Sequence, residues 1–285
     1  MKKSIKTIIA FAAVAAAFTS TWAAPKNKKT KLQTVTLGVT GTVYEDLWAP
    51  AIKTLKAQGI NLKLVQFSDY VTPNNALANK EIDLNGFQHR IFFEGELKKG
   101  YKLTNIGNTF LSPMNLYSNK IKSVDQLKKG DIVAIPNDVS NGGRALKVLA
   151  DAEIITLKAD AGFNPSVDDI VSNNKGVVIK ELAANTIPSV LPDVAAAVVN
   201  GNYAIDFGID PETAIFKDST INESEYWNLI AARTEDLSDS AKVEVFKKIV
   251  KAYQSAGTLE VYNKTYNGYY LATGWDEDRF ELIKK

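Results

Sequence analysis

The stretch TVTLGVTGTVYEDLWAPAIKTLKAQGINLKLVQF, residues 34–67, contains a strand pattern, a helix pattern and a second strand pattern in succession. Residues 34–40 are rich in β-branched side chains, which favour a strand. Residues 44–58 place apolar side chains at helical spacing, and Gly59 stands where a helix C-cap belongs. Residues 61–67 then alternate apolar and polar side chains, less regularly toward the end. The stretch therefore predicts a strand–helix–strand unit.

The same succession continues along the chain. We expect further strands at residues 102–106, 116–117, 131–135, 177–180, 194–199 and 227–232, with those at 177–180 and 194–199 buried. We expect helices at residues 73–78, 124–128 and 144–152, a last one from Ser238 or Asp239 to about residue 255, and a Gly-rich loop at residues 137–143. Strands that alternate with helices predict an α/β fold with mostly parallel sheets.

Length and composition exclude several classes of protein. At roughly 150 residues per domain, 285 residues suggest two domains. The formal charge of +2 includes three lysines among the first six residues, so the rest of the chain has no net positive charge that would favour nucleic acid. The chain has no cysteine and a single histidine, His89. A disulfide framework, a Cys-ligated metal site and a thiol nucleophile are therefore excluded.

The first 23 residues have the three parts of a secretory signal peptide. A basic start is followed by an apolar run over residues 8–18 and by a small-x-small cleavage site that ends at Ala23. The apolar run is too short to span a bilayer, which takes about 20 residues. Residues 24–33 are expected to form a flexible, solvated tether. We therefore expect an exported protein that is soluble after cleavage near Ala23.

The common catalytic signatures are missing. The sequence lacks a serine-hydrolase elbow, a phosphate-binding loop, a dinucleotide fingerprint and a zinc-protease helix. This favours a binding protein over an enzyme. An exported hydrolase or lyase is the alternative from another class, and it would depend on carboxylate, Lys or Tyr side chains for acid–base chemistry. A surface-interaction protein is a third class, which an exposed apolar patch away from any cleft would favour.

The informative polar residues lie near strand ends. Arg144 follows a pair of glycines at the expected start of a helix, where free N–H groups and a guanidinium favour a carboxylate. Alternatively, Arg144 is an exposed arginine whose aliphatic stem packs against the protein. Asn200 ends a buried strand and Asn228 lies near the start of another; each is either a turn residue or a partner for a charged ligand. His89 and Tyr70 are likewise either structural or part of a site.

Several stretches in order resemble the NlpA/MetQ-type family, the methionine-binding proteins that serve bacterial ABC importers. They are FSDYVTPN (67–74), NGFQH (85–89), GNTF (107–110), PND (136–138), NGGR (141–144), AVVN (197–200) and YWNLI (226–230). The resemblance covers almost the whole chain after the leader. It implies an α/β fold with two lobes, of the type 2-like periplasmic-binding-protein kind, whose hinge the chain crosses twice. Lobe 1 would comprise residues 34–117 and 223–285, and lobe 2 residues 118–222.

The resemblance also implies a ligand site. Tyr70, Phe87 and His89 would form an aromatic and imidazole wall, Arg144 would hold the ligand carboxylate with Asn141 in support, and Asn200 and Asn228 would bind the α-amino and carboxylate ends. The implied ligand is methionine, in the L or D form, bound without a cofactor or metal. The implied partner is an ABC permease in the inner membrane, and the protein is expected to be a monomer that closes over its ligand.

Two departures from the family pattern concern the anchor and the ligand. Members usually carry a lipid-modified cysteine just after the signal peptide, and because this chain has none we expect a free periplasmic protein. Ile187-Pro188-Ser189 stands where a Leu-Pro pair followed by arginine is expected, and Ser112 and Met114 are also atypical. One altered wall residue shifts ligand preference by about 1–3 kcal/mol. Another apolar or sulfur-containing amino acid is therefore the alternative ligand.

Overall fold

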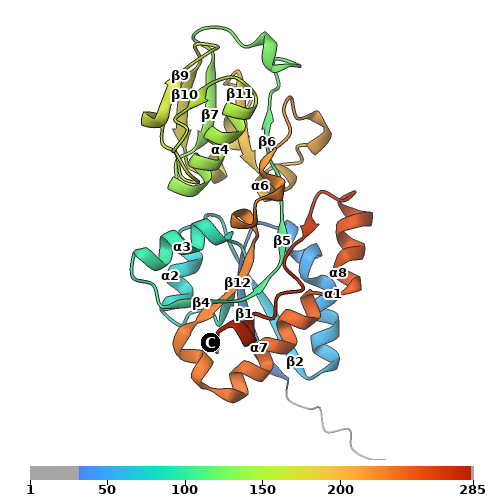
Figure 1. Ribbon diagram of the computed structural model, residues 1–285. Helices are drawn as coiled ribbons and strands as arrows, with labels where there is room; N and C mark the ends of the chain where they lie inside the picture. The colour runs from blue at the N-terminus through green and yellow to red at the C-terminus, as the bar shows by residue number, and fades with distance from the viewer. Residues whose placement is uncertain (1–31, 284–285) are drawn as a thin grey trace, which may run out of the picture. The chain divides into compact units, whose positions relative to one another are not determined.

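The computed structural model describes residues 32–283. The predicted signal peptide and most of the predicted tether lie outside these residues. None of the helices in the described part has the length and apolarity that a membrane crossing needs. The described residues form a two-lobed α/β fold, and each lobe has its own sheet. We call the five-stranded sheet with its helices lobe 1 and the four-stranded sheet with its helices lobe 2 (Figure 1).

The sheet of lobe 1 has the strand order β2-β1-β3-β12-β4. Its strands are β1 (Gln33–Thr40), β2 (Ile60–Phe67), β3 (Leu84–Asn85), β4 (Leu103–Asn108) and β12 (Leu229–Arg233). β1 pairs in parallel with β2 and β3, whereas β12 runs antiparallel to β3 and β4. The sheet therefore joins the beginning of the described chain to a strand from its last quarter.

Helices cover both faces of this sheet. They are α1 (Val43–Ala57) and α7 (Ser240–Tyr253) on one side and α2 (Thr72–Ala78) and α3 (Arg90–Lys98) on the other. α8 (Ala256–Glu260) packs beside α1, and α9 (Arg279–Ile283) lies near the end of the described chain. Alternate residues of β12 point into the two cores: Ile230 packs with α1 and α7, and Ala231 packs with α2 and α3. Because both faces are covered, every residue of β12 is buried.

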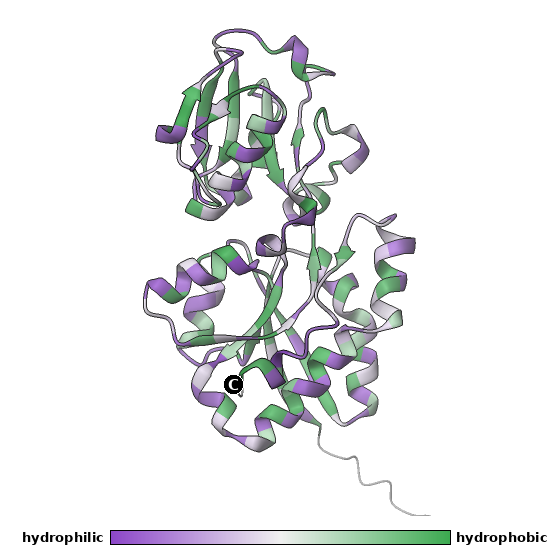
Figure 2. Ribbon diagram, viewed as in Figure 1, coloured by the Kyte–Doolittle hydropathy of each residue, from purple (hydrophilic) through white to green (hydrophobic). Residues whose placement is uncertain are grey.

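Lobe 2 repeats this layered arrangement around a sheet of order β10-β7-β11-β6. Its strands are β6 (Met114–Tyr117), β7 (Ile132–Pro136), β10 (Val178–Leu182) and β11 (Ala196–Asn200), and the short strands β8 (Thr156–Leu157) and β9 (Ile170–Ser172) pair separately. α4 (Val139–Asp151) packs on one face, and α5 (Ile187–Val190) and α6 (Gly201–Asp206) pack on the other. In Figure 2 the strands are mostly hydrophobic, whereas the helices carry both hydrophobic and hydrophilic residues.

The chain passes between the lobes twice. It leaves lobe 1 after β4 through β5 (Phe110–Leu111) and enters lobe 2 at β6, and it returns before β12 (Figure 1). β13 (Leu271–Ala272) pairs with β5 beside the first passage. β6 pairs with β11, so residues 114–117 belong to the sheet of lobe 2, whereas the expected boundary kept them with lobe 1.

The prediction of a loop at residues 137–143 is wrong from Val139 onward. α4 begins there, and the Asp138 side chain caps it by accepting a hydrogen bond from the Asn141 N–H. Arg144 therefore lies in the second turn of α4 and does not open the helix. An argument from free N–H groups at a helix start does not apply to this side chain.

One other expectation also differs from the structure. The strand expected to be buried at residues 177–180 is β10, an edge strand whose residues are mostly exposed. The sheets are mostly parallel, as expected, and each contains one strand that runs against the others: β12 in lobe 1 and β6 in lobe 2. Likewise, the helix expected at residues 44–58 is α1, and Gly59 follows its end with a φ of 83°.

Candidate ligand-binding site

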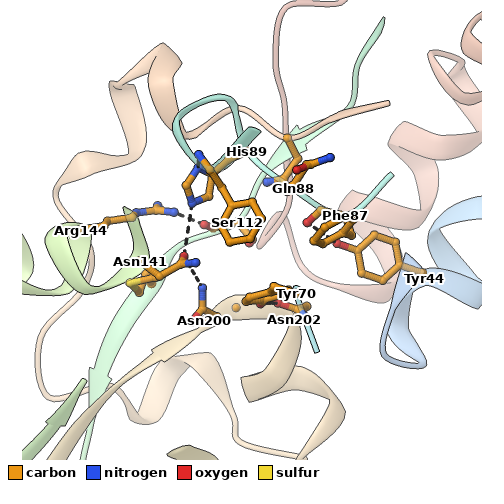
Figure 3. A pocket seen from close by; sticks show the side chains of 14 residues that line it. Tyr44, Tyr70, Phe87, Gln88, His89, Ser112, Asn141, Arg144, Asn200 and Asn202 are labelled. Atoms are coloured by element: carbon orange, nitrogen blue, oxygen red, sulfur yellow. Dashed lines mark hydrogen bonds between the residues drawn. The ribbon is translucent and has the colours of Figure 1, made fainter. Parts of the chain in front are cut away.

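One pocket is lined by side chains from both lobes (Figure 3). All seven residues that the family resemblance singles out line it: Tyr70, Phe87, His89, Asn141, Arg144, Asn200 and Asn228. Its other lining residues are Tyr44, Gln88, Phe92, Ser112, Met114, Gly201 and Asn202. The cavity volume is about 30 Å³. The fold therefore brings the seven expected residues together around a small cavity.

The Arg144 guanidinium is held by three partners. Its Nε donates to Thr220 Oγ1 at 3.0 Å, and its Nη2 donates to Ser112 O at 3.2 Å and to Asp218 Oδ2 at 2.5 Å. The guanidinium carbon also lies 4.4 Å from the centre of the Tyr226 ring. Nη1 makes no hydrogen bond with any residue in the described part of the chain. Arg144 is thus fixed in orientation and keeps one amino group for another partner.

Asn141 connects residues of the two lobes. Its Oδ1 accepts a hydrogen bond from Asn200 Nδ2 at 2.8 Å and faces His89 Nε2 at 3.3 Å (Figure 3). Its Nδ2 donates to both carboxylate oxygens of Asp138, so the orientation of the amide is defined. Asn141 was expected to support Arg144, but within residues 32–283 its side chain binds these three residues instead. Asn141 therefore fixes the orientation of the pocket amide of Asn200.

Asn200 presents a free acceptor. Its Oδ1 is buried and has no hydrogen-bond partner among the described residues. A buried carbonyl oxygen without a partner costs free energy, so an N–H donor placed in the pocket would be favoured there. An ammonium group supplies such a donor with a positive charge.

His89 is the N-cap of α3. Its Nδ1 accepts a hydrogen bond from the Phe92 N–H at 3.2 Å, so in the neutral ring the proton is on Nε2, which then donates to Asn141. Burial, with the nearby Arg144 charge, lowers the pKa of His89 from its ordinary value of 6.5 to about 3. The ring is therefore neutral at physiological pH, and Arg144 is the cation of this pocket.

Aromatic rings form the apolar wall of the pocket. Tyr70 stacks on Phe87 with a centroid distance of 5.9 Å, and Phe92 meets both rings edge-on. The Tyr70 hydroxyl donates to Asn202 Oδ1 at 2.6 Å, and burial raises its pKa well above the usual value. Tyr44 donates to Phe87 O at 3.3 Å, which fixes the backbone beside the wall.

Asn228 lies directly before β12 and forms a bridge to His89. Its backbone N–H donates to Phe110 O at 2.7 Å, and its carbonyl accepts from Thr109 N–H at 2.8 Å. Within residues 32–283 its side-chain amide makes no hydrogen bond, although the residue is buried and lines the pocket. Its amide is therefore available to a bound molecule.

Several residues that line the pocket or hold Arg144 were not predicted from the sequence. Phe92 and Asn202 were within reach of the motifs: Phe92 stands one helical turn after His89, and Asn202 follows Asn200 by two residues. Asp218 and Thr220 carried no such signal, because they are 74 and 76 residues away from Arg144 in the sequence. Only the fold brings them to the guanidinium.

These groups define what the pocket can bind. A guanidinium with one free amino group, a free amide carbonyl and a wall of aromatic rings suit a small molecule with an anionic end, a cationic end and an apolar tail. In the part of the chain that the structure describes, no group of three or more His, Asp or Glu side chains is arranged to hold a metal ion. The arrangement favours binding by charge and shape.

Comparisons with known proteins point in the same direction. A model of the NlpA lipoprotein family matches residues 35–273. The D-methionine-binding lipoprotein MetQ of Yersinia pestis is 39% identical over 273 residues, which cover 94% of this chain and 98% of that protein. The MetQ lipoprotein of Escherichia coli (strain K12) is 45% identical over 214 residues, which cover 74% of this chain and 77% of that protein.

Solved structures are similar over both lobes. A nutrient-binding protein from Burkholderia cenocepacia bound to methionine has 40% sequence identity and a TM-score of 0.78, and the match covers 84% of this chain and all of that one (100%). The substrate-binding protein of a methionine transporter from Streptococcus pneumoniae has 31% identity and a TM-score of 0.80, with 85% of this chain and 96% of that one covered.

Proposed function

We propose that this chain, which belongs to the NlpA lipoprotein family, binds free methionine between its lobes and delivers it to an ABC permease. The observation that carries the proposal is that one pocket is lined by both Arg144, whose Nη1 is free, and Asn200, whose Oδ1 is free. These two groups match the two charged ends of a zwitterion. Relatives named for D-methionine and a homologous structure with bound methionine support this choice of amino acid.

In the proposed complex the ligand carboxylate binds Nη1 of Arg144 and the amide of Asn228. The ammonium group donates to Asn200 Oδ1, which replaces the missing partner of that buried oxygen. The side chain extends along the wall of Tyr70, Phe87 and Phe92, where a thioether packs favourably against aromatic rings. Hydrogen bonds, one charge-assisted contact and a buried side chain are compatible with the roughly 8–12 kcal/mol of a micromolar to nanomolar complex.

Entry of the ligand requires the lobes to separate. The cavity of about 30 Å³ is far below the roughly 300–1,000 Å³ of typical ligand pockets. We propose that lobe 1 and lobe 2 move as two bodies about the two passages of the chain, with residues 118–222 and β6 in one body and the remainder in the other. Ligand that contacts both lobes would favour the closed arrangement.

We further propose that the protein is exported by a cleaved signal peptide and acts in the periplasm as a monomer without enzymatic activity. The curated relatives named above are lipoproteins by name, whereas these 285 residues contain no cysteine to carry a lipid. Cell fractionation with a palmitate label tests this part: protein in the soluble periplasmic fraction without label is the expected result.

Native mass spectrometry of gently purified protein tests the ligand, because a bound amino acid adds its own mass. A thermal-shift panel of amino acids in both enantiomers, on protein that has been unfolded and refolded to remove ligand, gives the ranking. The largest shift is expected with methionine. A larger shift with another apolar or sulfur-containing amino acid would keep the pocket and replace the ligand, and no shift with any amino acid would contradict the proposed function.

A further inference from the structure

A carboxylate of lobe 2 caps the first helix of lobe 1. Asp206, the last residue of α6, accepts hydrogen bonds from Val43 N–H at 2.8 Å and from Thr42 Oγ1 at 2.8 Å through Oδ1. The Thr42 N–H lies 3.1 Å from each of its carboxylate oxygens. These groups are the N-cap and first residue of α1. Asp206 thus occupies the position that a capping side chain usually takes.

α1 has no cap of its own. Its N-cap residue, Thr42, makes no capping hydrogen bond within the helix, because its hydroxyl donates to Asp206 instead. The first N–H groups of a helix have no partner inside the helix and attract a negative charge. In an arrangement with the lobes apart, only water could satisfy the N–H groups of Thr42 and Val43.

The chain around this contact is shaped for it. Gly41 has a φ of 94°, a conformation that side chains other than glycine rarely adopt. A Cβ at this position would overlap the Asp206 carboxylate. Among residues 32–283 the Asp206 side chain makes no hydrogen bond within its own lobe. Its position at the end of α6 is also unfavourable for an anion, so nothing in lobe 2 accounts for a carboxylate there.

Other groups of α6 cross to lobe 1 beside Asp206. Asn202 Nδ2 donates to Thr40 O at 3.1 Å, and its Oδ1 accepts from the Tyr70 hydroxyl at 2.6 Å. The Tyr203 hydroxyl donates to Ser68 O at 3.2 Å. Asn202 and Tyr70 line the ligand pocket, but Asp206 and Thr42 do not. The capping contact therefore lies outside the pocket. Asp206 is nevertheless on the same short helix, α6, as Asn202, which lines the pocket.

We propose that Asp206 determines ligand affinity without touching the ligand, by capping α1 from the opposite lobe and stabilising the closed arrangement. This rests on the proposed function, in which ligand affinity includes the free energy of closure. Loss of the cap lowers the closed population and weakens apparent binding by about fivefold, the factor expected from one helix cap of typical strength. Because the contact breaks on opening, the dissociation rate should rise more than the association rate falls.

The test compares wild type, Asp206→Ala, Thr42→Val and the double variant by methionine calorimetry and stopped-flow dissociation. Asp168→Ala is the matched control, since Asp168 is an exposed carboxylate of lobe 2. The proposal predicts weaker binding and faster release for Asp206→Ala, a smaller effect for Thr42→Val, and no added loss in the double variant. Unchanged affinity and release in Asp206→Ala, with methionine binding intact in wild type, would overturn it.

Amide hydrogen exchange separates failure of this inference from failure of the proposed function. Without any ligand, the N–H groups of Thr42 and Val43 should exchange faster in Asp206→Ala than in wild type, while circular dichroism shows the same fold. Equal exchange in both proteins, without ligand and with saturating methionine, would show that the cap does not form in solution. If wild type fails to bind methionine, the proposed function fails and this comparison still decides the role of Asp206.

Discussion

Arg144 and Asp218 form an ion pair inside the protein. Nη2 of Arg144 lies 2.5 Å from Oδ2 of Asp218, and the two side chains are 4% and 0% exposed. Asp218 also accepts hydrogen bonds from Met114 N–H and from Thr220, so its carboxylate is fully engaged. The charge of Arg144 is therefore balanced within the protein. A ligand carboxylate would bind the remaining N–H donors of a guanidinium that is already held in place.

Because of this ion pair, replacing Arg144 should have two separate effects, one on ligand binding and one on stability. Arg144→Ala should weaken methionine binding at least about a hundredfold, because the charge-assisted contact to the carboxylate is lost. It should also lower the free energy of unfolding by about 3–5 kcal/mol, since Asp218 is left buried without its cation. Calorimetry and urea denaturation measure the two losses.

The control for Arg144 is a second substitution at its partner. Arg144→Leu combined with Asp218→Asn should recover part of the stability, since no unpaired charge is buried, but none of the affinity. Full affinity in either variant would show that the carboxylate binds elsewhere.

Asn200 should act through its free oxygen. Asn200→Ala removes the proposed acceptor for the ammonium group and should raise the Kd for methionine by about tenfold or more, as expected for a hydrogen bond to a charged group. Stability should fall by about 0.5–1.5 kcal/mol, because the hydrogen bond from Asn200 Nδ2 to Asn141 Oδ1 is lost, whereas Oδ1 has no partner to lose among the described residues. Asn222→Ala, at an exposed asparagine, is the control. An equal Kd for wild type and Asn200→Ala would argue against the proposed ligand pose.

The helices α1 and α4 show which local structure could be predicted from the sequence and which could not. α1, β1 and β2 were predictable to within a residue or two, because their apolar patterns are local and are buried as the pattern implies. α4 was misjudged because Gly142 and Gly143 suggested a loop. The structure shows another reason for these glycines: a Cβ on Gly142 would lie 2.8 Å from Pro136 O, and on Gly143 2.9 Å from Asn164 Cα.

In the candidate site, too, one part could be predicted from the sequence and another could not. The seven residues gathered from the family resemblance all line the pocket, yet their interactions were not predictable. Asn141 binds His89 and Asn200 and not Arg144, and the partner of Arg144 is the distant Asp218. Such pairings depend on how β6, α4 and the return passage meet, and no local pattern in the sequence contains that information.

The single histidine allows a direct test of its environment. The folded pKa of His89 is about 3 and its ordinary value is 6.5, so between these values the unfolded chain binds a proton that the folded protein does not. The contribution to stability is complete above pH 6.5 and is lost as the pH falls. From pH 6.5 to 5.5 the free energy of unfolding should drop by about 1 kcal/mol from this group.

Urea denaturation of wild type and His89→Asn between pH 8 and 5.5 checks this expectation. Asparagine retains a capping acceptor for α3 but does not titrate. The wild type should lose more stability than His89→Asn as the pH falls below 6.5. Parallel pH dependence of the two proteins would show that the ring is accessible to protons in the folded state.

The aromatic wall predicts a preference for sulfur. Norleucine replaces the methionine sulfur by CH₂, and loss of the sulfur–ring contacts should weaken binding by about 0.3–1.5 kcal/mol, or about two- to twelvefold. Alanine, which cannot reach the rings, should bind far more weakly. Competition titrations give the order, and norleucine binding more tightly than methionine would contradict a thioether-specific wall.

The most direct test of the account is calorimetric titration of L- and D-methionine into refolded, ligand-free wild-type protein. Saturable binding of one molecule per chain is expected, with a Kd in the micromolar range or below for at least one enantiomer. An absence of binding heat with both enantiomers at two temperatures, for protein with a cooperative unfolding transition, would contradict it.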